Sequence, residues 1–195
     1  MNEFTPVIDF VSRFINLTDD EVECFAGLLR TVKIKKRQFT VQPKFVCQHM
    51  SFIAEGAMRA YMVDGDGNEH TIALGIEGWC VNDYSSYILQ EPATFFVEAL
   101  EDSTLIQLSY KNEQLLYQLI PKFERCFRIT AQRAAASIQR RILSNISMTA
   151  EERYEELASR YPRLLQRIPQ YAIASYLGFT TEYLSKIRNK KSKKS

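Results

Sequence analysis

The residues best suited to chemistry lie near the C-terminal end of the sequence, between Gln170 and Arg188. Apolar residues there have the spacing of two short helices that cross steeply at a tight turn. Ala174 is small enough for the helices to meet, and Gly178 suits the turn. The outward face of the second helix carries groups that bond phosphates and base edges. These candidate DNA-binding residues are Thr180, Thr181, Glu182, Ser185, Lys186 and Arg188.

This pattern predicts a helix-turn-helix that enters the major groove of DNA. Thr180 or Thr181 is expected to cap the second helix and to direct its N–H groups outward toward an anion. A carboxylate such as that of Glu182 can accept a hydrogen bond from a cytosine amino group. The alternative interpretation is an ordinary helical hairpin with no nucleic-acid partner.

Charge supports the DNA interpretation, because its distribution is uneven. The net charge of the 195 residues is +2. Residues 1–110 hold 8 basic and 16 acidic residues, whereas residues 111–195 hold 17 basic and 7 acidic ones, so the halves carry −8 and +10. A basic half joined to an acidic one is typical of a protein that meets a polyanion with one segment only. The alternative is a dipolar surface without a partner. Residues 189–195 are predicted to be a disordered basic tail.

Other chemistries find little support in the sequence. Metal-dependent enzymes with small β-barrels need two or three converging histidines, and only His49 and His70 occur, without an HxH motif. No local signature of a Ser-His-Asp triad is present, and Cys80 beside Trp79 is more typical of a structural thiol. We therefore expect no catalytic residue, no metal and no cofactor.

The cellular setting follows from composition. The four cysteines are far apart and form no CxxC pair, which favours reduced thiols and a cytoplasmic protein. No apolar run reaches about 18 residues, so no membrane span is expected. The first residues lack the pattern of a secretory signal.

The elements that must position the DNA-binding segment follow from hydrophobic periodicity. Helical spacing in the first 29 residues gives way to a period of two from about Thr31 to Ser109, which is typical of several short strands in a small barrel or roll. Helical spacing returns after Tyr110, and Pro121 suits the start of a longer helix. We expect an α+β protein with four segments, at residues 1–120, 121–147, 148–188 and 189–195.

The long helix predicted over 121–147 carries an apolar stripe that approximates a heptad seam with small residues in its middle. So long a helix outreaches a small roll, which favours a homodimer interface. The alternative is that the stripe packs on its own domain. The residues expected in the interface are Phe127, Ala131, Ala134, Ile138 and Ile142.

In this order of elements the chain resembles the Crp–Fnr family of bacterial transcription regulators. The resemblance covers essentially the whole chain and is carried best by Gly56–Tyr61, Leu108–Tyr110 with Pro121, and Ile168–Arg188. It implies a jelly-roll-like β-roll sensor domain (a double-stranded β-helix), a dimerisation helix and a C-terminal helix-turn-helix. It also implies a homodimer that binds two-fold-symmetric double-stranded DNA, with RNA polymerase and an unidentified small-molecule effector as further partners to consider.

The effector cassette departs from the family pattern. Cyclic-nucleotide-binding members carry a Gly-Glu pair and an arginine that neutralises the cyclic phosphate; the matching positions here are Asn82-Asp83 and Ala93-Thr94. Without the guanidinium, control by cAMP in the family's usual manner is not expected. Trp79, Tyr84, Tyr87, Phe95 and Phe96 either line an apolar pocket or form ordinary core.

Two further expectations concern the C-terminal domain. The β-hairpin wing of the relatives must be minimal or missing, with Arg163 and Arg167 touching the phosphate backbone instead. The alternative function is a ligand-sensing β-roll dimer that responds to an unidentified small molecule or cyclic nucleotide and binds DNA weakly or not at all.

Overall fold

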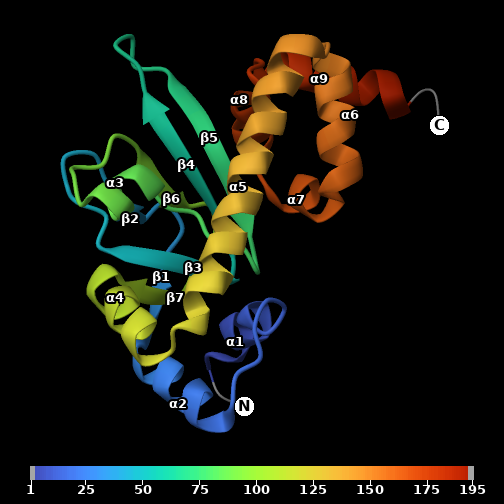
Figure 1. Ribbon diagram of the computed structural model, residues 1–195. Helices are drawn as coiled ribbons and strands as arrows, with labels where there is room; N and C mark the ends of the chain where they lie inside the picture. The colour runs from blue at the N-terminus through green and yellow to red at the C-terminus, as the bar shows by residue number, and fades with distance from the viewer. Residues whose placement is uncertain (1–2, 193–195) are drawn as a thin grey trace.

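The computed structural model describes residues 3–192 and shows a β-roll, a long helix and a helical C-terminal domain (Figure 1). Two antiparallel sheets form the roll, with strand orders β1-β7-β3 and β2-β6-β4-β5. The α+β class predicted from the sequence is confirmed. The strands are β1 (Leu29–Ile34), β2 (Phe39–Val41), β3 (His49–Glu55), β4 (Ala57–Val63), β5 (Glu69–Ile76), β6 (Phe96–Ala99) and β7 (Ser103–Ser109).

Alternation along β4 shows how the roll is filled. Met58 and Ala60 face the core between the sheets, with Ile53 of β3 and Leu105 of β7. The intervening Arg59 is buried as well, because helix α8 covers the outer face of β4 and β5. Because both faces of β4 are covered, its first five residues are all buried.

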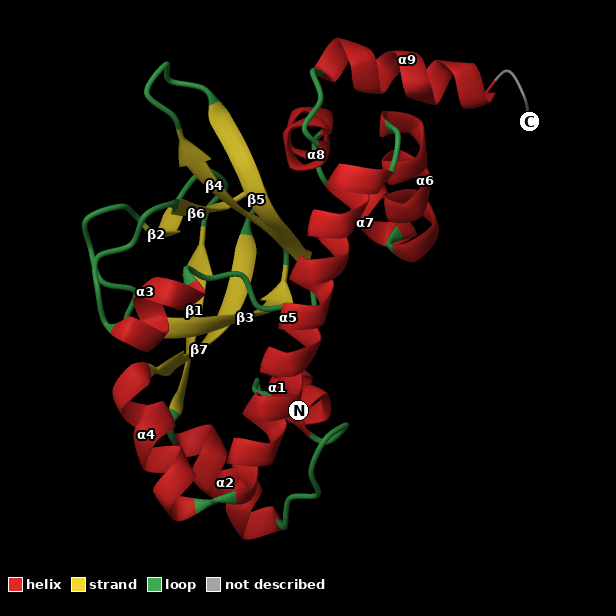
Figure 2. Ribbon diagram, turned by 45° about the horizontal axis from the view of Figure 1, so that its top comes forward, coloured by secondary structure: helices red, strands yellow, loops and turns green. Residues whose placement is uncertain are grey.

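Helices precede and follow the strands in the chain, and in space most of them lie below the roll or along one side of it (Figure 2). Capping boxes begin α2 at Thr18 and α6 at Thr149, and in each the threonine and the glutamate three residues later bond the first turn reciprocally. Periodicity did not predict α3, a short helix that follows Asp83. The helices are α1 (Thr5–Val11), α2 (Asp19–Gly27), α3 (Tyr84–Leu89), α4 (Tyr110–Leu119), α5 (Lys122–Ser147), α6 (Ala150–Arg160), α7 (Pro162–Arg167), α8 (Gln170–Leu177) and α9 (Thr181–Ser192). Among them none combines the length and apolar character that a bilayer span requires.

The long helix α5 has 26 residues and two different environments. Near its start, Phe123 and Cys126 are buried against α1 and α2, in a cluster that includes Val7 and Phe25. From Gln132 onward nearly every residue is exposed. The helix is therefore anchored on the roll at one end and projects past it at the other.

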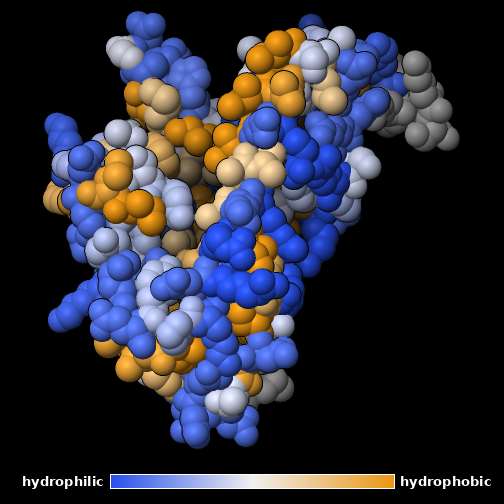
Figure 3. Space-filling model, viewed as in Figure 1, coloured by the Kyte–Doolittle hydropathy of each residue, from blue (hydrophilic) through white to orange (hydrophobic). Residues whose placement is uncertain are grey.

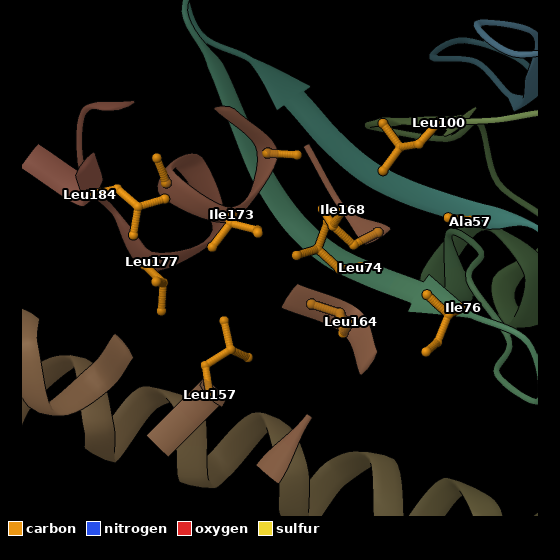
Figure 4. Close-up of a cluster of buried hydrophobic side chains, with 12 residues drawn as sticks. Ala57, Leu74, Ile76, Leu100, Leu157, Leu164, Ile168, Ile173, Leu177 and Leu184 are labelled. Atoms are coloured by element: carbon orange, nitrogen blue, oxygen red, sulfur yellow. The ribbon is translucent and has the colours of Figure 1, made fainter. Parts of the chain in front are cut away.

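The C-terminal domain packs on the roll through a shared apolar cluster (Figure 4). Leu74 and Ile76 of β5 lie in this cluster with Ile173 and Leu177 of α8 and Leu164 of α7. Burial of these side chains stabilises the arrangement by about 1.5–3 kcal/mol each. The two domains therefore share one core.

Strand β5 is an edge strand, so its outer backbone groups need partners from elsewhere. The Ser175 hydroxyl of α8 provides two of them: it accepts from the Thr71 N–H at 2.8 Å and donates to the Glu69 carbonyl at 2.9 Å. Helix α8 thus closes the sheet edge as a further strand would.

A β-bulge on the same edge leaves a further backbone carbonyl without a partner in the sheet. Ala60 lies opposite Ala73 and Tyr61 lies opposite Thr71, which leaves Ile72 as the extra residue. The Arg141 guanidinium of α5 donates to the Ile72 carbonyl and, at 3.2 and 3.3 Å, to the carbonyls of Thr71 and Tyr176. One side chain therefore ties α5, β5 and α8 together, and we call this set of contacts the Arg141 junction.

The structure bears on two sequence predictions about the C-terminal domain, the disordered tail and the minimal or missing wing. The disordered tail predicted from residue 189 is wrong for residues 189–192, because α9 continues through Ser192. Lysine is a good helix former, and Lys190 pairs with Glu151 of α6 at 2.9 Å. Residues 193–195 lie outside the described chain. No strand follows β7 in the described residues, and helix α7 occupies the stretch where a wing was expected to be minimal or missing.

The Arg141 junction generates a stability prediction. Replacing Arg141 with alanine leaves three partly buried carbonyls without this donor, so the free energy of unfolding should fall by about 2–3 kcal/mol. The neighbouring Arg140 is exposed and makes no hydrogen bond or ion pair in the described chain, so Arg140→Ala should change stability by less than about 0.5 kcal/mol. Urea denaturation of both variants measures the difference. Equal effects would contradict the assigned role of Arg141.

Candidate nucleic-acid interface and effector cassette

The predicted helix-turn-helix is built from α8 and α9. Gly178 adopts φ 76°, a left-handed conformation that suits glycine, and its N–H bonds the Ser175 carbonyl at 3.1 Å. The Phe179 N–H bonds the Ala174 carbonyl at 2.8 Å, which completes the turn. Leu184 and Ile187 of α9 are buried, so their face packs inward and the opposite face of α9 is presented to solvent.

Thr180 is the residue that caps α9. Its hydroxyl accepts from the Tyr183 N–H at 3.2 Å, while Thr181 is the first helical residue. Of the two capping alternatives that the sequence left open, the structure therefore selects Thr180. Thr181, Glu182 and Lys186 are exposed.

The outer face of α9 differs from the sequence prediction at its edges. Ser185 is half-buried and lies 3.4 Å from Gln170 of α8, so its hydroxyl is partly engaged inside the motif. Arg188 is exposed. Asn189 is also exposed and lies seven residues after Glu182, on the same helical face. Sequence reasoning missed Asn189 because it assigned that residue to the tail.

Electrostatics along α9 run from acidic to basic. The backbone N–H of Glu182, the Thr180 hydroxyl and Lys186 lower the pKa of the Glu182 carboxyl, so it is ionised at neutral pH. Lys186, Arg188 and Lys190 follow it toward the C-terminal end. Such a face supplies one acceptor for base amino groups and several donors for phosphates and purine acceptors. Figure 2 shows α9 at one end of the molecule, with α8 and α6 on its inner side.

Arg167 does not point to a DNA backbone as expected. Its guanidinium donates to Glu77 at 2.5 Å and to Glu101, both in the roll. Arg163 lies 3.6 Å from Glu77 and its side chain is 72% exposed. No local pattern indicates these partners, because they lie some 66 to 90 residues away along the chain.

The effector-cassette residues are occupied by bonds within the protein. The buried Asp83 carboxylate caps α3 by accepting from the Ser86 N–H at 3.0 Å and holds the Thr94 N–H at 2.9 Å. The Asn82 side chain accepts from the Ser51 N–H at 2.9 Å. Ala93 is buried and supplies no cation. The structure therefore uses these groups to fix α3 rather than to present free polar atoms.

Helix α3 is also held from beneath. The buried Tyr87 hydroxyl donates to Glu113 of α4 at 2.5 Å, and Tyr117 donates to the same carboxylate at 2.6 Å. The aromatic residues suggested for one pocket are dispersed: Trp79 packs on Tyr161, whereas Tyr87 packs on Tyr110. A hollow of about 580 Å³ borders the cassette: its lining runs from Ile34 to Cys47 and includes Phe45, whose carbonyl accepts from the Ala93 N–H at 2.9 Å.

The residues expected in a dimer interface divide into two groups. Phe127 and Ala131 are half-buried, and Phe127 packs on Tyr117 and Phe123 of its own chain. Ala134, Ile138 and Ile142 are exposed. Leu143 and Ile146, which the predicted stripe did not include, are exposed as well. Figure 3 shows apolar surface over the C-terminal half of α5. The exposed fractions are 61% for Ile138, 54% for Ile142, 56% for Leu143 and 78% for Ile146.

The histidines serve structural contacts. His70 lies 2.6 Å from Asp64 in the β4–β5 hairpin, and burial lowers the pKa of His49. In the part of the chain that the structure describes, no three His, Cys, Asp or Glu side chains gather in a metal-binding arrangement.

Comparisons with known proteins concern the fold. Residues 31–118 match the family model described as the cyclic nucleotide-binding domain. FixK2 from Bradyrhizobium japonicum superposes with a TM-score of 0.73 at 16% identity over 85% of each chain. CLP, a c-di-GMP responsive global regulator from Xanthomonas campestris, superposes with a TM-score of 0.70 at 15% identity, covering 91% of this chain and 93% of its own. The catabolite activator protein of Thermus thermophilus has a TM-score of 0.57 at 18% identity, with 95% and 87% covered. No curated protein matches the sequence significantly.

The turn of the helix-turn-helix generates a testable prediction. Gly178→Ala forces an L-residue into φ 76° without a steric clash, so the loss of stability should be about 1–2 kcal/mol and should come from the backbone. Gly27 is the matched control, since it lies at the end of α2 without positive φ and has open space around it. Urea denaturation should show Gly27→Ala as neutral or slightly stabilising. A Gly178→Ala protein as stable as the Gly27→Ala protein would contradict the assigned turn.

Proposed function

We propose that this chain, which has the fold of the Crp–Fnr transcription regulators, is a regulator that binds two-fold-symmetric duplex DNA as a homodimer. The observation that carries the proposal is the exposed polar face of α9, held outward by a turn at Gly178 and by the packing of α8 on β5. Thr180, Thr181, Glu182, Ser185, Lys186 and Arg188 are the proposed contacts with DNA, and Asn189 joins them.

The charge of the molecule supports this assignment. Residues 111–195, which carry a net charge of +10, would contact the DNA phosphates, and the acidic roll would lie away from them. Base contacts from α9 would then supply sequence preference, because phosphate contacts alone carry none.

The homodimer is proposed from the exposed apolar surface of α5. Ala134, Ile138 and Ile142 occupy one face at heptad-like spacing, and the alanine lets two helices approach closely. Leu143 and Ile146 extend the surface toward the C-terminal domain. Two copies joined along α5 would place two α9 helices on one face of DNA, in half-sites about one helical turn apart.

Control by cAMP in the family's usual manner is not part of the proposal. A cyclic phosphate needs a cation, and Ala93 stands where one would be required. Asp83 and Thr94 are bonded to each other, so rearranging them for a ribose would break contacts that cap α3.

DNA binding is tested by selecting bound sequences from random duplexes and then measuring affinity by fluorescence anisotropy. Lys186→Ala should cost about 1–3 kcal/mol of binding free energy and loosen preference at one base pair. The matched control is Lys111→Ala on α4, an exposed lysine at the end of the molecule away from α9 (Figure 1). The logarithm of affinity should also fall steeply with that of salt concentration. An affinity that is unchanged by salt concentration and by Lys186→Ala would favour the ligand-sensing alternative.

The dimer seam is tested by sedimentation. Ala134→Glu buries a carboxylate in the seam and should yield a monomer that has lost specific DNA binding. Ala136→Glu makes the same change two residues further, on the opposite and equally exposed side of α5, and should leave the dimer intact. A dimer that survives Ala134→Glu would remove α5 from this role.

A further inference from the structure

A cleft lies where α5 meets the C-terminal domain, and four arginines line it. Arg140 and Arg141 come from α5, whereas Arg153 and Arg160 come from α6. Tyr176 of α8 closes the cleft on a further side. Its free volume is about 60 Å³, room for roughly four to six water molecules. The function proposed above makes no use of this cleft.

Most of the positive charge in the cleft is uncompensated. Arg160 pairs with Glu156 at 3.1 Å, and Glu156 is the one carboxylate in the lining. Arg140, Arg141 and Arg153 form no ion pair within the described chain. The sequence from Arg125 to Ala150 contains no acidic residue, so α5 brings no counter-charge of its own.

The arginines differ in how their donors are used. Arg141 donates hydrogen bonds to three carbonyls, and its guanidinium carbon lies 4.1 Å from the centre of the Tyr176 ring. Arg153 donates to Asn145 at 3.2 Å, but its Nε atom is buried and has no acceptor. Arg140 makes no hydrogen bond at all in the described chain. Free donors from two helices therefore border one small cleft.

Such an arrangement favours a bound anion. Burial lowers the pKa of Arg141, which shows that its surroundings disfavour the charged form. An anion between these guanidiniums would reverse that penalty and balance the positive charge of Arg153. Planar guanidiniums match the oxygens of a phosphate in bidentate geometry, and three unpaired positive charges suit a doubly charged anion better than a single carboxylate.

We propose that the cleft between α5, α6 and α8 is a binding site for a phosphate group, held by Arg140 and Arg153 and completed by the charge of Arg141. The group is either free inorganic phosphate or the phosphate of a small phosphorylated molecule. The site is separate from the proposed DNA-binding face of α9, so it can be tested without DNA and stands or falls independently of the proposed function.

Calorimetric titration of the full-length protein with inorganic phosphate, in the absence of DNA, tests the site. The wild-type protein should show saturable binding, and Arg140→Gln should weaken it about tenfold by removing a charged donor. Because Arg140 has no partner in the fold, this variant should unfold at the same urea concentration as the wild type. The matched control is Arg125→Gln, an exposed arginine on the same helix but outside the cleft, and it should bind phosphate as the wild type does.

A parallel titration with adenosine 5′-monophosphate, and with adenosine as its control, distinguishes the two sources. Tighter binding of the monophosphate that is lost in Arg140→Gln identifies a phosphorylated small molecule as the ligand class, whereas equal or weaker binding identifies the free ion. Absence of saturable phosphate binding to the wild-type protein would overturn the proposal. An equal loss in Arg125→Gln would do the same, since the attraction would then be that of a basic surface.

Discussion

The open edge of β5 is the constraint on which the architecture depends. Its backbone groups cannot stay unpaired in a buried interface, and the bulge at Ile72 frees one carbonyl more. Ser175 from α8 and Arg141 from α5 satisfy them. The same contacts that close the sheet therefore set where α8 and α9, the proposed DNA-binding helices, stand relative to the roll and to the long helix.

This junction links sites that would otherwise be independent. Arg141 holds β5 and α8, and it also lines the arginine cleft. An anion in the cleft would act on the residue that fixes the orientation of α8. The roll contributes from its other side through Arg59, which lies 5.0 Å from the Tyr171 ring of α8 and pairs with Glu98 and Glu69. These contacts join α8, which carries α9 through the turn, to the roll on one side and to α5 on the other.

Local features were predictable from sequence, and long-range contacts were not. The capping boxes, the turn at Gly178 and the order of elements depend on residues a few positions apart, so spacing alone predicts them. The inward turn of Asp83 onto Thr94, the pairing of Arg167 with Glu77 and Glu101, and the docking of α8 on β5 depend on tertiary packing that has no local signature. The prediction of a disordered tail from residue 189 rested on composition, whereas α9 continues through Ser192 and Lys190 pairs with Glu151.

Amide hydrogen exchange, followed residue by residue with and without the selected duplex, tests the account most directly. We predict that the Thr71 amide exchanges as slowly as the core strands in both states, because Ser175 holds it. We also predict that added DNA slows exchange along α9 while the roll is unchanged. A Thr71 amide that exchanges as fast as a loop, or DNA protection that falls outside α9, would contradict the account.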